Sequence, residues 1–158
     1  MRLRIDGTEV QARPGESLRE ILLREGMDSA ELASRPLAAR IAGEVFTLNY
    51  IPVRQSDAAP EAASLRQAMA ASKGEIRLLR YHDGAGKKVY TRTACFLVFL
   101  ALRQRWPEGS AKISCTMGNS IYISVKDCRD FSVDALKEGL SSLIKEDFPL
   151  IRRRVPLQ

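Results

Sequence analysis

The chain has 158 residues and a formal net charge of +6, with 45% hydrophobic and 28% charged residues. This balance is typical of globular domains and excludes a largely disordered or fibrous chain, and the length fits one or two domains. No apolar segment follows the first residues as in a signal peptide, and the longest apolar run, residues 94–102, is too short to cross a bilayer. We therefore expect a cytoplasmic protein with no membrane partner.

Alternating polarity and turn residues divide the first half into short elements. The patterns predict strands at residues 2–5, 8–12, 36–42, 45–48 and 75–80, a helix from Ser17 to Gly26, a loop at 54–61 and a short helix at 62–72. Asp6-Gly7 is a hairpin signal, and Ser17 with Glu20 has the spacing of a helix capping box. This order suits a β-grasp fold, in which a small mixed sheet packs against one helix.

The second half has a different organisation. The patterns predict a turn at residues 83–86, a helix at 93–106, a hairpin of strands 111–117 and 120–125, a helix at 132–148 and a strand at 150–155. The helix at 93–106 is apolar around most of its circumference, so we expect it at the centre of a core. Pro107 ends it, and Ser132 is the expected N-cap of the next helix. The whole chain is therefore predicted to be α+β.

Three cysteines, Cys95, Cys115 and Cys128, show no CxxC pairing. An odd number without such spacing predicts free thiols, and free cysteines are usually buried as small apolar residues. We expect that environment for all three.

The first half resembles the TGS domain of threonyl-tRNA synthetases, some GTPases and stringent-response synthetases. The matching segments are Gly15 to Leu18 and the run LAARIAGEVFTLNYIPV at residues 37–53. Ala42 stands where that family often has Asn. The resemblance implies a TGS-like β-grasp domain at residues 1–80, with residues 54–72 as a loop and short-helix insertion.

The stretch YTRTACFLVFLALRQRWPEGSAKISCTMGNSIYISV at residues 90–125 resembles the second accessory domain of threonyl-tRNA synthetase. In that family a helix carrying HxxxH leads to an aromatic-Pro pair, here Trp106-Pro107, and a strand with a G-x-Y element follows. Counting back from Trp106, the two family histidines fall on Arg92 and Phe96. The resemblance therefore implies the shape of a tRNA-editing domain at residues 81–158 without its zinc ligands.

The order of a TGS domain followed by this accessory domain also resembles the start of bacterial uridine kinase-like nucleoside kinases. Their pattern of Asp-Gly, then Tyr-x-Arg-Ser/Thr before the helix, reads here as Asp83-Gly84 and Tyr90 to Thr93. Cys115 replaces a usual His, and Ser120 replaces a usual Gly before the aromatic Tyr122. The resemblance implies a P-loop kinase domain further along the same polypeptide, and homodimerisation stays open.

Catalytic chemistry has little support in the sequence. The one histidine, His82, fits a surface turn beside Asp83, and a catalytic zinc needs about three protein ligands. The best remaining ligand cluster, Cys128 with two aspartates, lies in a charged turn. Residues 84–88, Gly-Ala-Gly-Lys-Lys, lack the G-x-x-x-x-G-K-[ST] frame of a phosphate loop and fit a hairpin turn with solvated lysines better. We expect no metal site and no cofactor in this segment.

Basic residues indicate contact with RNA or another anion, because phosphates attract such patches without sequence specificity. The candidates are Lys87, Lys88, Arg103, Arg152, Arg153 and Arg154. Tyr81, Tyr90 and Trp106 could stack on bases. The competing interpretation is that these charges lie on ordinary solvated surfaces.

Two functions follow from the sequence. In the first, the chain is a non-catalytic module that binds a ligand or RNA, tRNA included, and regulates a uridine kinase-like enzyme. Its ligand cleft would be lined by Arg92, Phe96, Cys115 and Tyr122, with the guanidinium of Arg92 holding a phosphate or carboxylate. In the second, the chain is a free-standing tRNA-editing-type hydrolase. The missing histidines oppose the second.

Overall fold

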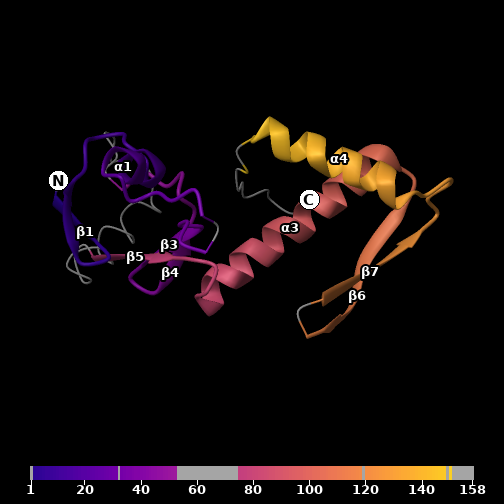
Figure 1. Ribbon diagram of the computed structural model, residues 1–158, viewed down its shortest axis with the longest axis horizontal. Coiled ribbons are helices and arrows are strands. Elements are labelled where there is room, and N and C mark those ends of the chain that lie inside the picture. The colour runs from indigo at the N-terminus through magenta and orange to yellow at the C-terminus, as the bar shows by residue number, and fades with distance from the viewer. Residues whose placement is uncertain (1, 32, 53–74, 119, 149, 151–158) are drawn as a thin grey trace, which may run out of the picture. The chain divides into compact units, whose positions relative to one another are not determined.

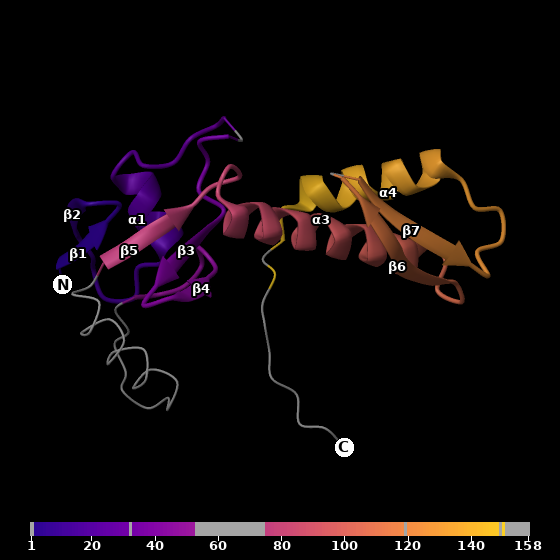
Figure 2. The same cartoon turned by 90° about the horizontal axis from the view of Figure 1, so that it is seen from below.

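The computed structural model describes residues 2–31, 33–52, 75–118, 120–148 and 150 (Figures 1 and 2). The chain divides into two compact units, residues 1–91 and 92–158, which we call the N-terminal and C-terminal units. The predicted short helix at 62–72 and most of the predicted strand at 150–155 lie outside the described residues. The described elements form mixed sheets and helices, which confirms the α+β class.

The N-terminal unit is a five-stranded mixed sheet with one short helix. Its elements are β1 (Arg2–Ile5), β2 (Thr8–Gln11), α1 (Leu18–Arg24), β3 (Ala38–Ile41), β4 (Glu44–Phe46) and β5 (Glu75–Leu79). The strand order is β2-β1-β5-β3-β4, in which β1 and β5 pair in parallel and the other pairs are antiparallel. Its assignment to the β-grasp fold specifically stays a prediction.

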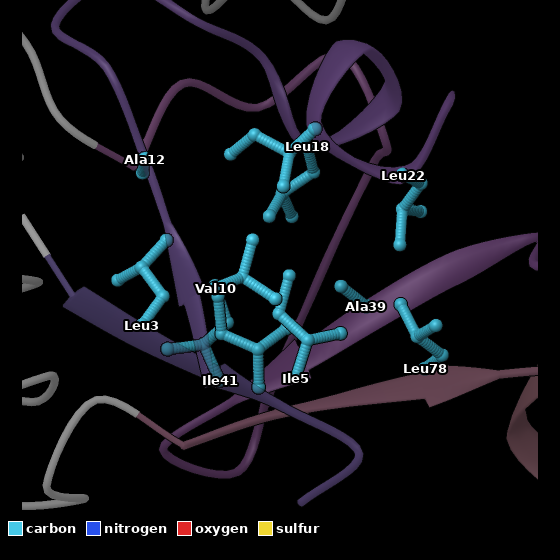
Figure 3. Close-up of a cluster of buried hydrophobic side chains, with 11 residues drawn as sticks. Leu3, Ile5, Val10, Ala12, Leu18, Leu22, Ala39, Ile41 and Leu78 are labelled. Atoms are coloured by element: carbon cyan, nitrogen blue, oxygen red, sulfur yellow. The ribbon is translucent and has the colours of Figure 1, made fainter. Parts of the chain in front are cut away.

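One apolar cluster joins α1 to the sheet (Figure 3). Alternate residues of the strands supply its floor, as the period-2 pattern requires. Three α1 side chains spaced i, i+3 and i+4 close it from above. The members are Leu3, Ile5, Val10, Ala12, Leu18, Ile21, Leu22, Ala39, Ile41, Ile76 and Leu78.

Strands β3 and β4 are shorter than predicted, for local reasons. Ala42 (φ 49°) and Gly43 (φ 89°) both take left-handed conformations, so β3 ends at Ile41 in a two-residue turn. Strand β4 ends at Phe46 because the chain then turns toward α1. There the carbonyl groups of Leu48 and Tyr50 accept hydrogen bonds from the amides of Arg19 and Leu18. These bonds satisfy two amides that a helix N-terminus leaves without partners.

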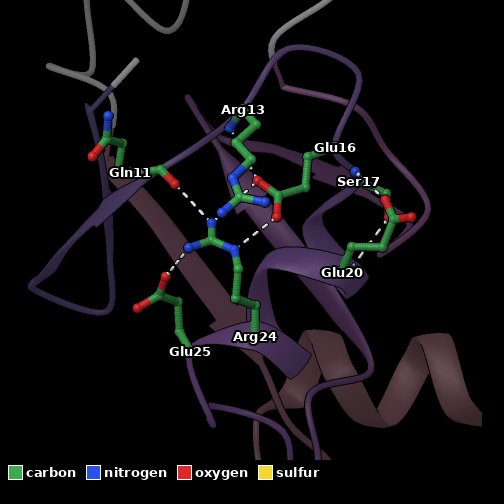
Figure 4. Close-up of polar contacts among 7 residues, drawn as sticks. All are labelled: Gln11, Arg13, Glu16, Ser17, Glu20, Arg24 and Glu25. Carbon is green, nitrogen blue, oxygen red and sulfur yellow. Dashed lines mark hydrogen bonds and ion pairs between the residues drawn. The ribbon is translucent and has the colours of Figure 1, made fainter.

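The predicted capping box is present and adjoins an ion-pair network (Figure 4). The backbone amide of Ser17 donates to the Glu20 carboxylate at 2.7 Å, and the Glu20 amide donates to Ser17 Oγ at 3.3 Å. Arg24 donates from Nε to Glu16 at 2.8 Å and from Nη2 to the carbonyl oxygen of Gln11 at 2.7 Å. It also pairs with Glu25. The network ties the end of β2 to the last turn of α1.

These contacts make the stability of the N-terminal unit depend on pH. The hydrogen bond from Arg24 lowers the pKa of Glu16, and the backbone hydrogen bond from Ser17 lowers the pKa of Glu20. Both folded-state pKa values lie below the ordinary value of 4.5, so their stabilisation is present above that pH and is lost as the pH falls through the folded pKa. Urea unfolding at pH 6 and pH 3 should show this loss.

A matched substitution isolates the contribution of Glu20. The variant Glu20→Gln keeps the hydrogen-bonding capacity of a capping box but removes the titrating group. We expect it to lose less stability than the unmodified chain between pH 6 and pH 3. Glu44→Gln, at an exposed position of β4, serves as the control and should leave the loss unchanged. An equal loss in Glu20→Gln and the unmodified chain would contradict this assignment.

Helix α3 (Gly84–Arg105) starts nine residues before the predicted position at Thr93. The segment predicted as a turn is its first turn, because the Lys87 amide bonds the Asp83 carbonyl at 2.8 Å. The Asp83 carboxylate accepts a hydrogen bond from the Arg80 amide at 2.8 Å, which lowers the pKa of Asp83. The prediction of a hairpin turn at residues 84–88 was therefore wrong. The glycines at 84 and 86 had suggested a break in the helix. The division between the two units falls within α3.

The C-terminal unit contains the end of α3, the hairpin of β6 (Ser110–Met117) and β7 (Ser120–Lys126), and α4 (Val133–Glu146). The Ser132 hydroxyl accepts from the Ala135 amide, so the predicted N-cap is confirmed. Helices α3 and α4 approach closely at Gly139, where a methyl group would lie 3.8 Å from the Cβ of Ala101.

The helix predicted at 93–106, which was expected at the centre of a core, is buried only toward its end. In the described part of the C-terminal unit, the buried apolar side chains are Ala101, Leu102, Trp106 and Leu143. Phe96, which lies before Ala101 in α3, is 50% exposed. An apolar composition predicts a buried helix only where neighbouring elements cover its sides, and here they cover one side of its last turns, since Arg103 to Arg105 are exposed.

Candidate functional site: a groove around Trp106

The four residues predicted to line a ligand cleft lie on two elements of the C-terminal unit. Arg92 and Phe96 are exposed and stand four residues apart on α3. Cys115 and Tyr122 are also exposed, and they pair directly across the hairpin of β6 and β7. None of the four lines either of the two grooves described below. A cleft formed by all four stays a prediction.

The predicted RNA-binding residues are also spread along the chain. Lys87 and Lys88 are exposed in the first turns of α3, within the N-terminal unit. Arg103 is exposed near the end of α3 and lines a groove. The remaining three, Arg152, Arg153 and Arg154, lie outside the described residues.

Trp106 has a structural environment that its sequence position did not reveal. Its side chain is only 9% exposed, its Nε1 donates to the carbonyl oxygen of Arg129 at 2.9 Å, and its ring lies 5.2 Å from that of Phe131. A ring held in this way cannot stack on a base, so that role was wrongly predicted. Tyr81 and Tyr90 are partly exposed but pack edge to face, with 5.1 Å between ring centroids.

Two open grooves adjoin at Trp106, Gly109 and Cys128, which belong to both. We call them together the Trp106 groove. One part, of about 390 Å³, lies against Phe99, Leu102 and Arg103 of α3 and the start of β6. The other part, of about 720 Å³, is lined in addition by Arg105, Pro107, Glu108, Asp127 and Arg129. Volumes of this order suit small ligands or a segment of a larger one.

Basic residues outnumber acidic ones in the lining of the Trp106 groove. Arg103, Arg105 and Arg129 contribute guanidinium groups, against the carboxylates of Glu108 and Asp127. Within the described part of the chain, no side-chain hydrogen bond or ion pair engages the three guanidinium groups. Planar guanidinium groups bind phosphates and carboxylates through two parallel hydrogen bonds, so the lining is suited to an anion.

Arg103 was predicted from the sequence as an anion-binding residue, whereas Arg129, which also lines the groove, was not. A turn brings Arg129 to the groove, and two residues of that turn, Asp127 (φ 57°) and Asp130 (φ 53°), have left-handed backbones. Aspartate tolerates this conformation better than most residues. The two aspartates around Cys128 were therefore the signal in the sequence for a turn that carries Arg129.

The cysteines are free thiols, as predicted, but they are not all core residues. Cys115 is exposed and pairs with Tyr122 across the hairpin. Cys95 and Cys128 are half-buried. Among the described residues, no group of three or more His, Cys, Asp or Glu side chains is placed to hold a metal ion.

Gly109 is required by the packing of the groove. A methyl group at this position would lie 2.3 Å from Cys128 Sγ and 3.2 Å from the carbonyl oxygen of Trp106. We expect Gly109→Ala to destabilise the C-terminal unit by about 1–3 kcal/mol, the usual cost of overpacking. Denaturant unfolding followed by the fluorescence of the single tryptophan measures it.

Removing the opposing sulfur should rescue this variant. In Gly109→Ala/Cys128→Ala the new methyl group occupies space that Sγ vacates, so we expect most of the lost stability to return. The double-mutant cycle supplies its own control in Cys128→Ala alone. Additive losses would show that Gly109 and Cys128 are not in contact.

Comparison with known proteins gives one informative similarity. The chain is 28% identical over 82 residues to a threonine–tRNA ligase from Caldanaerobacter subterraneus subsp. tengcongensis, a match that covers 50% of this chain and 13% of the relative. No protein-family model matches the sequence. The similarity supports a region related to threonyl-tRNA synthetases, as the sequence resemblance implied.

Of the helices in the described residues, none combines the length and the apolar composition that a bilayer span needs.

Proposed function

We propose that this chain is a non-catalytic module that binds RNA or another anionic ligand, and that the Trp106 groove is a contact surface. The similarity to a threonine–tRNA ligase carries the proposal, because tRNA is named in the function of that relative. The excess of guanidinium groups in the groove supports it. Such groups contact phosphates without reading sequence.

The non-catalytic part of the proposal rests on Arg92 and Phe96. These residues occupy the helix positions where the resembled editing domain has its two histidines. Arginine stays protonated at neutral pH and phenylalanine has no lone pair, so neither replaces a histidine ligand. Arg92 is exposed and free to contact an anion instead.

We further propose that the module serves a uridine kinase-like nucleoside kinase in the cytoplasm. The supporting residues are Asp83-Gly84 and the run from Tyr90 to Thr93. Reading the native open reading frame beyond the codon for Gln158 tests this context. A G-x-x-x-x-G-K-[ST] loop downstream would support it, and an immediate stop codon would contradict it.

Fluorescence anisotropy with labelled tRNA tests the binding function. We expect the unmodified chain to bind and Arg103→Ala/Arg129→Ala to bind roughly tenfold or more weakly, because two phosphate contacts are lost. The matched control, Lys137→Ala/Lys145→Ala, removes the same charge from the exposed side of α4. Equal weakening in both double variants would assign the effect to net charge and exclude the groove. No binding by the unmodified chain would overturn the proposal.

A second titration tests Arg92 separately. Calorimetry with inorganic phosphate should show weaker binding by Arg92→Ala than by the unmodified chain. Lys137→Ala is again the control for charge. Unchanged phosphate binding would show that Arg92 does not bind an anion. The proposal for the groove residues would not be affected.

A further inference from the structure

The face of the five-stranded sheet turned away from α1 carries a group of arginines. In β1, β3 and β5, alternate residues enter the core, so the intervening residues share the opposite face. The register confirms the grouping, because Arg40 pairs with Arg77 and Arg4 pairs with Glu75. We call Arg2, Arg4, Arg40 and Arg77 the sheet arginines. They come from three adjacent strands, which lie about 4.8 Å apart.

Three of the four sheet arginines are exposed, and Arg40 is partly buried. Arg2, Arg4 and Arg77 are exposed, and the side chain of Arg77 is 67% accessible. Arg4 uses only its Nε, which donates to the Gly7 carbonyl at 3.3 Å, so its terminal nitrogens make no hydrogen bond with the described residues. Arg40 has a buried Nε without a hydrogen-bond partner in the described part of the chain.

The sheet arginines place like charges close together. Arg40 and Arg77 stand directly opposite each other, and like charges at such positions repel. The nearby carboxylates are Glu9, which pairs with Arg4 across β1 and β2, Glu75, and Asp83 at 3.6 Å from Arg77. Four arginines against two glutamates on the face leave an excess positive charge that an external anion would compensate.

The chemistry of this face favours a phosphate backbone over other polyanions. Its described residues include no aromatic side chain on which unpaired bases could stack, as single-strand binders require. Val45, 48% exposed, is its one large exposed apolar residue, which gives a membrane or a protein partner little to bury. Guanidinium groups on adjacent strands match a row of phosphates, each of which can accept two parallel hydrogen bonds.

We propose that the sheet arginines bind the phosphate backbone of double-helical RNA without reading its sequence. This surface belongs to the N-terminal unit and is separate from the Trp106 groove, so the inference goes beyond the proposed function. It assigns an RNA contact to residues that neither the sequence motifs nor the groove identified.

Anisotropy with a labelled 20-base-pair RNA duplex of arbitrary sequence, measured at several salt concentrations, tests the proposal. We expect Arg4→Ala/Arg77→Ala to bind roughly 10- to 100-fold more weakly. The slope of log affinity against log salt concentration should also become less steep by about two, one for each lost phosphate contact. Arg35→Ala/Lys137→Ala removes the same charge elsewhere and should change the affinity less than threefold. Equal effects in the two double variants would overturn the proposal.

A conservative variant distinguishes the loss of an RNA contact from a folding defect. Glu75→Gln removes a carboxylate beside Arg4 and should raise the affinity for the duplex severalfold, which a damaged sheet cannot do. Unchanged or weaker binding by Glu75→Gln would count against the sheet face. Binding to anionic phosphatidylglycerol vesicles with none to the duplex would also overturn the proposal. Measuring the Arg103→Ala/Arg129→Ala variant in the same titration separates the two proposals, because this variant changes the Trp106 groove and leaves the sheet arginines intact.

Discussion

Gly86→Ala is expected to destabilise the N-terminal unit by about 3 kcal/mol or more, at or beyond the upper end of the usual overpacking cost. A methyl group at this position would lie 1.9 Å from the carbonyl oxygen of Arg80 and 2.7 Å from its carbonyl carbon. These are backbone atoms, which a rotamer change cannot move. Relief would require a shift of the connection between β5 and α3, where Lys87 and Asp83 form the first helical hydrogen bond. Urea unfolding followed by circular dichroism measures the loss.

Gly84→Ala is the matched control, because it adds the same methyl group to the same turn of α3. Apart from its chain neighbours and the adjacent backbone of its own helix, no described atom lies within 4 Å of the position that this methyl group would take. We expect its stability to be unchanged, or raised by about 0.5–1 kcal/mol through the better helix propensity of alanine. A similar loss in both variants would contradict the close approach of Gly86 to Arg80.

Ile41→Ala should have the second large effect, a loss of about 2–5 kcal/mol. Ile41 is 0% exposed and lies on β3, in the cluster that joins the sheet to α1 (Figure 3). Its truncation removes buried apolar surface and leaves a cavity that the surrounding strands cannot close. The free energy of unfolding from urea titrations gives the magnitude.

Val45→Ala provides the comparison on the neighbouring strand. Val45 is also β-branched, but it is 48% exposed and lies on the opposite face of the sheet. We expect a loss below about 1 kcal/mol, mainly from β propensity. If Ile41→Ala cost no more than Val45→Ala, the core would not lie between α1 and the sheet as described.

The local rules that predicted the N-terminal unit act within a few residues. The turn at Asp6-Gly7 and the capping box of Ser17 and Glu20 depend only on near neighbours, and both are present. The end of β4 at Phe46 depends on hydrogen bonds between residues 48–50 and α1, which lie some thirty residues apart in the chain. A sequence pattern carries no signal for such a contact.

The start of α3 shows why glycine misled the prediction. Gly84 and Gly86 suggested a loop because glycine weakens helices. Gly86 is instead present because the backbone of Arg80 leaves no room for a side chain. The same residue type therefore marks a close approach inside a regular element, which only the tertiary structure reveals.

The candidate site was predictable only in part. Arg103 could be selected from its charge, whereas the groove depends on Trp106 turning inward to bond the carbonyl of Arg129. That bond joins residues 23 positions apart. The sheet arginines needed the strand register, because Arg40 and Arg77 meet only through the pairing of β3 and β5.

The most direct test of the central claim measures the hydrolysis of a mischarged aminoacyl-tRNA at a protein concentration that saturates tRNA binding. We expect that the tRNA is bound while its ester is hydrolysed at the same rate as without protein, with or without a chelator. Protein-dependent hydrolysis that a chelator abolishes would contradict a non-catalytic module and would establish the editing-type hydrolase instead.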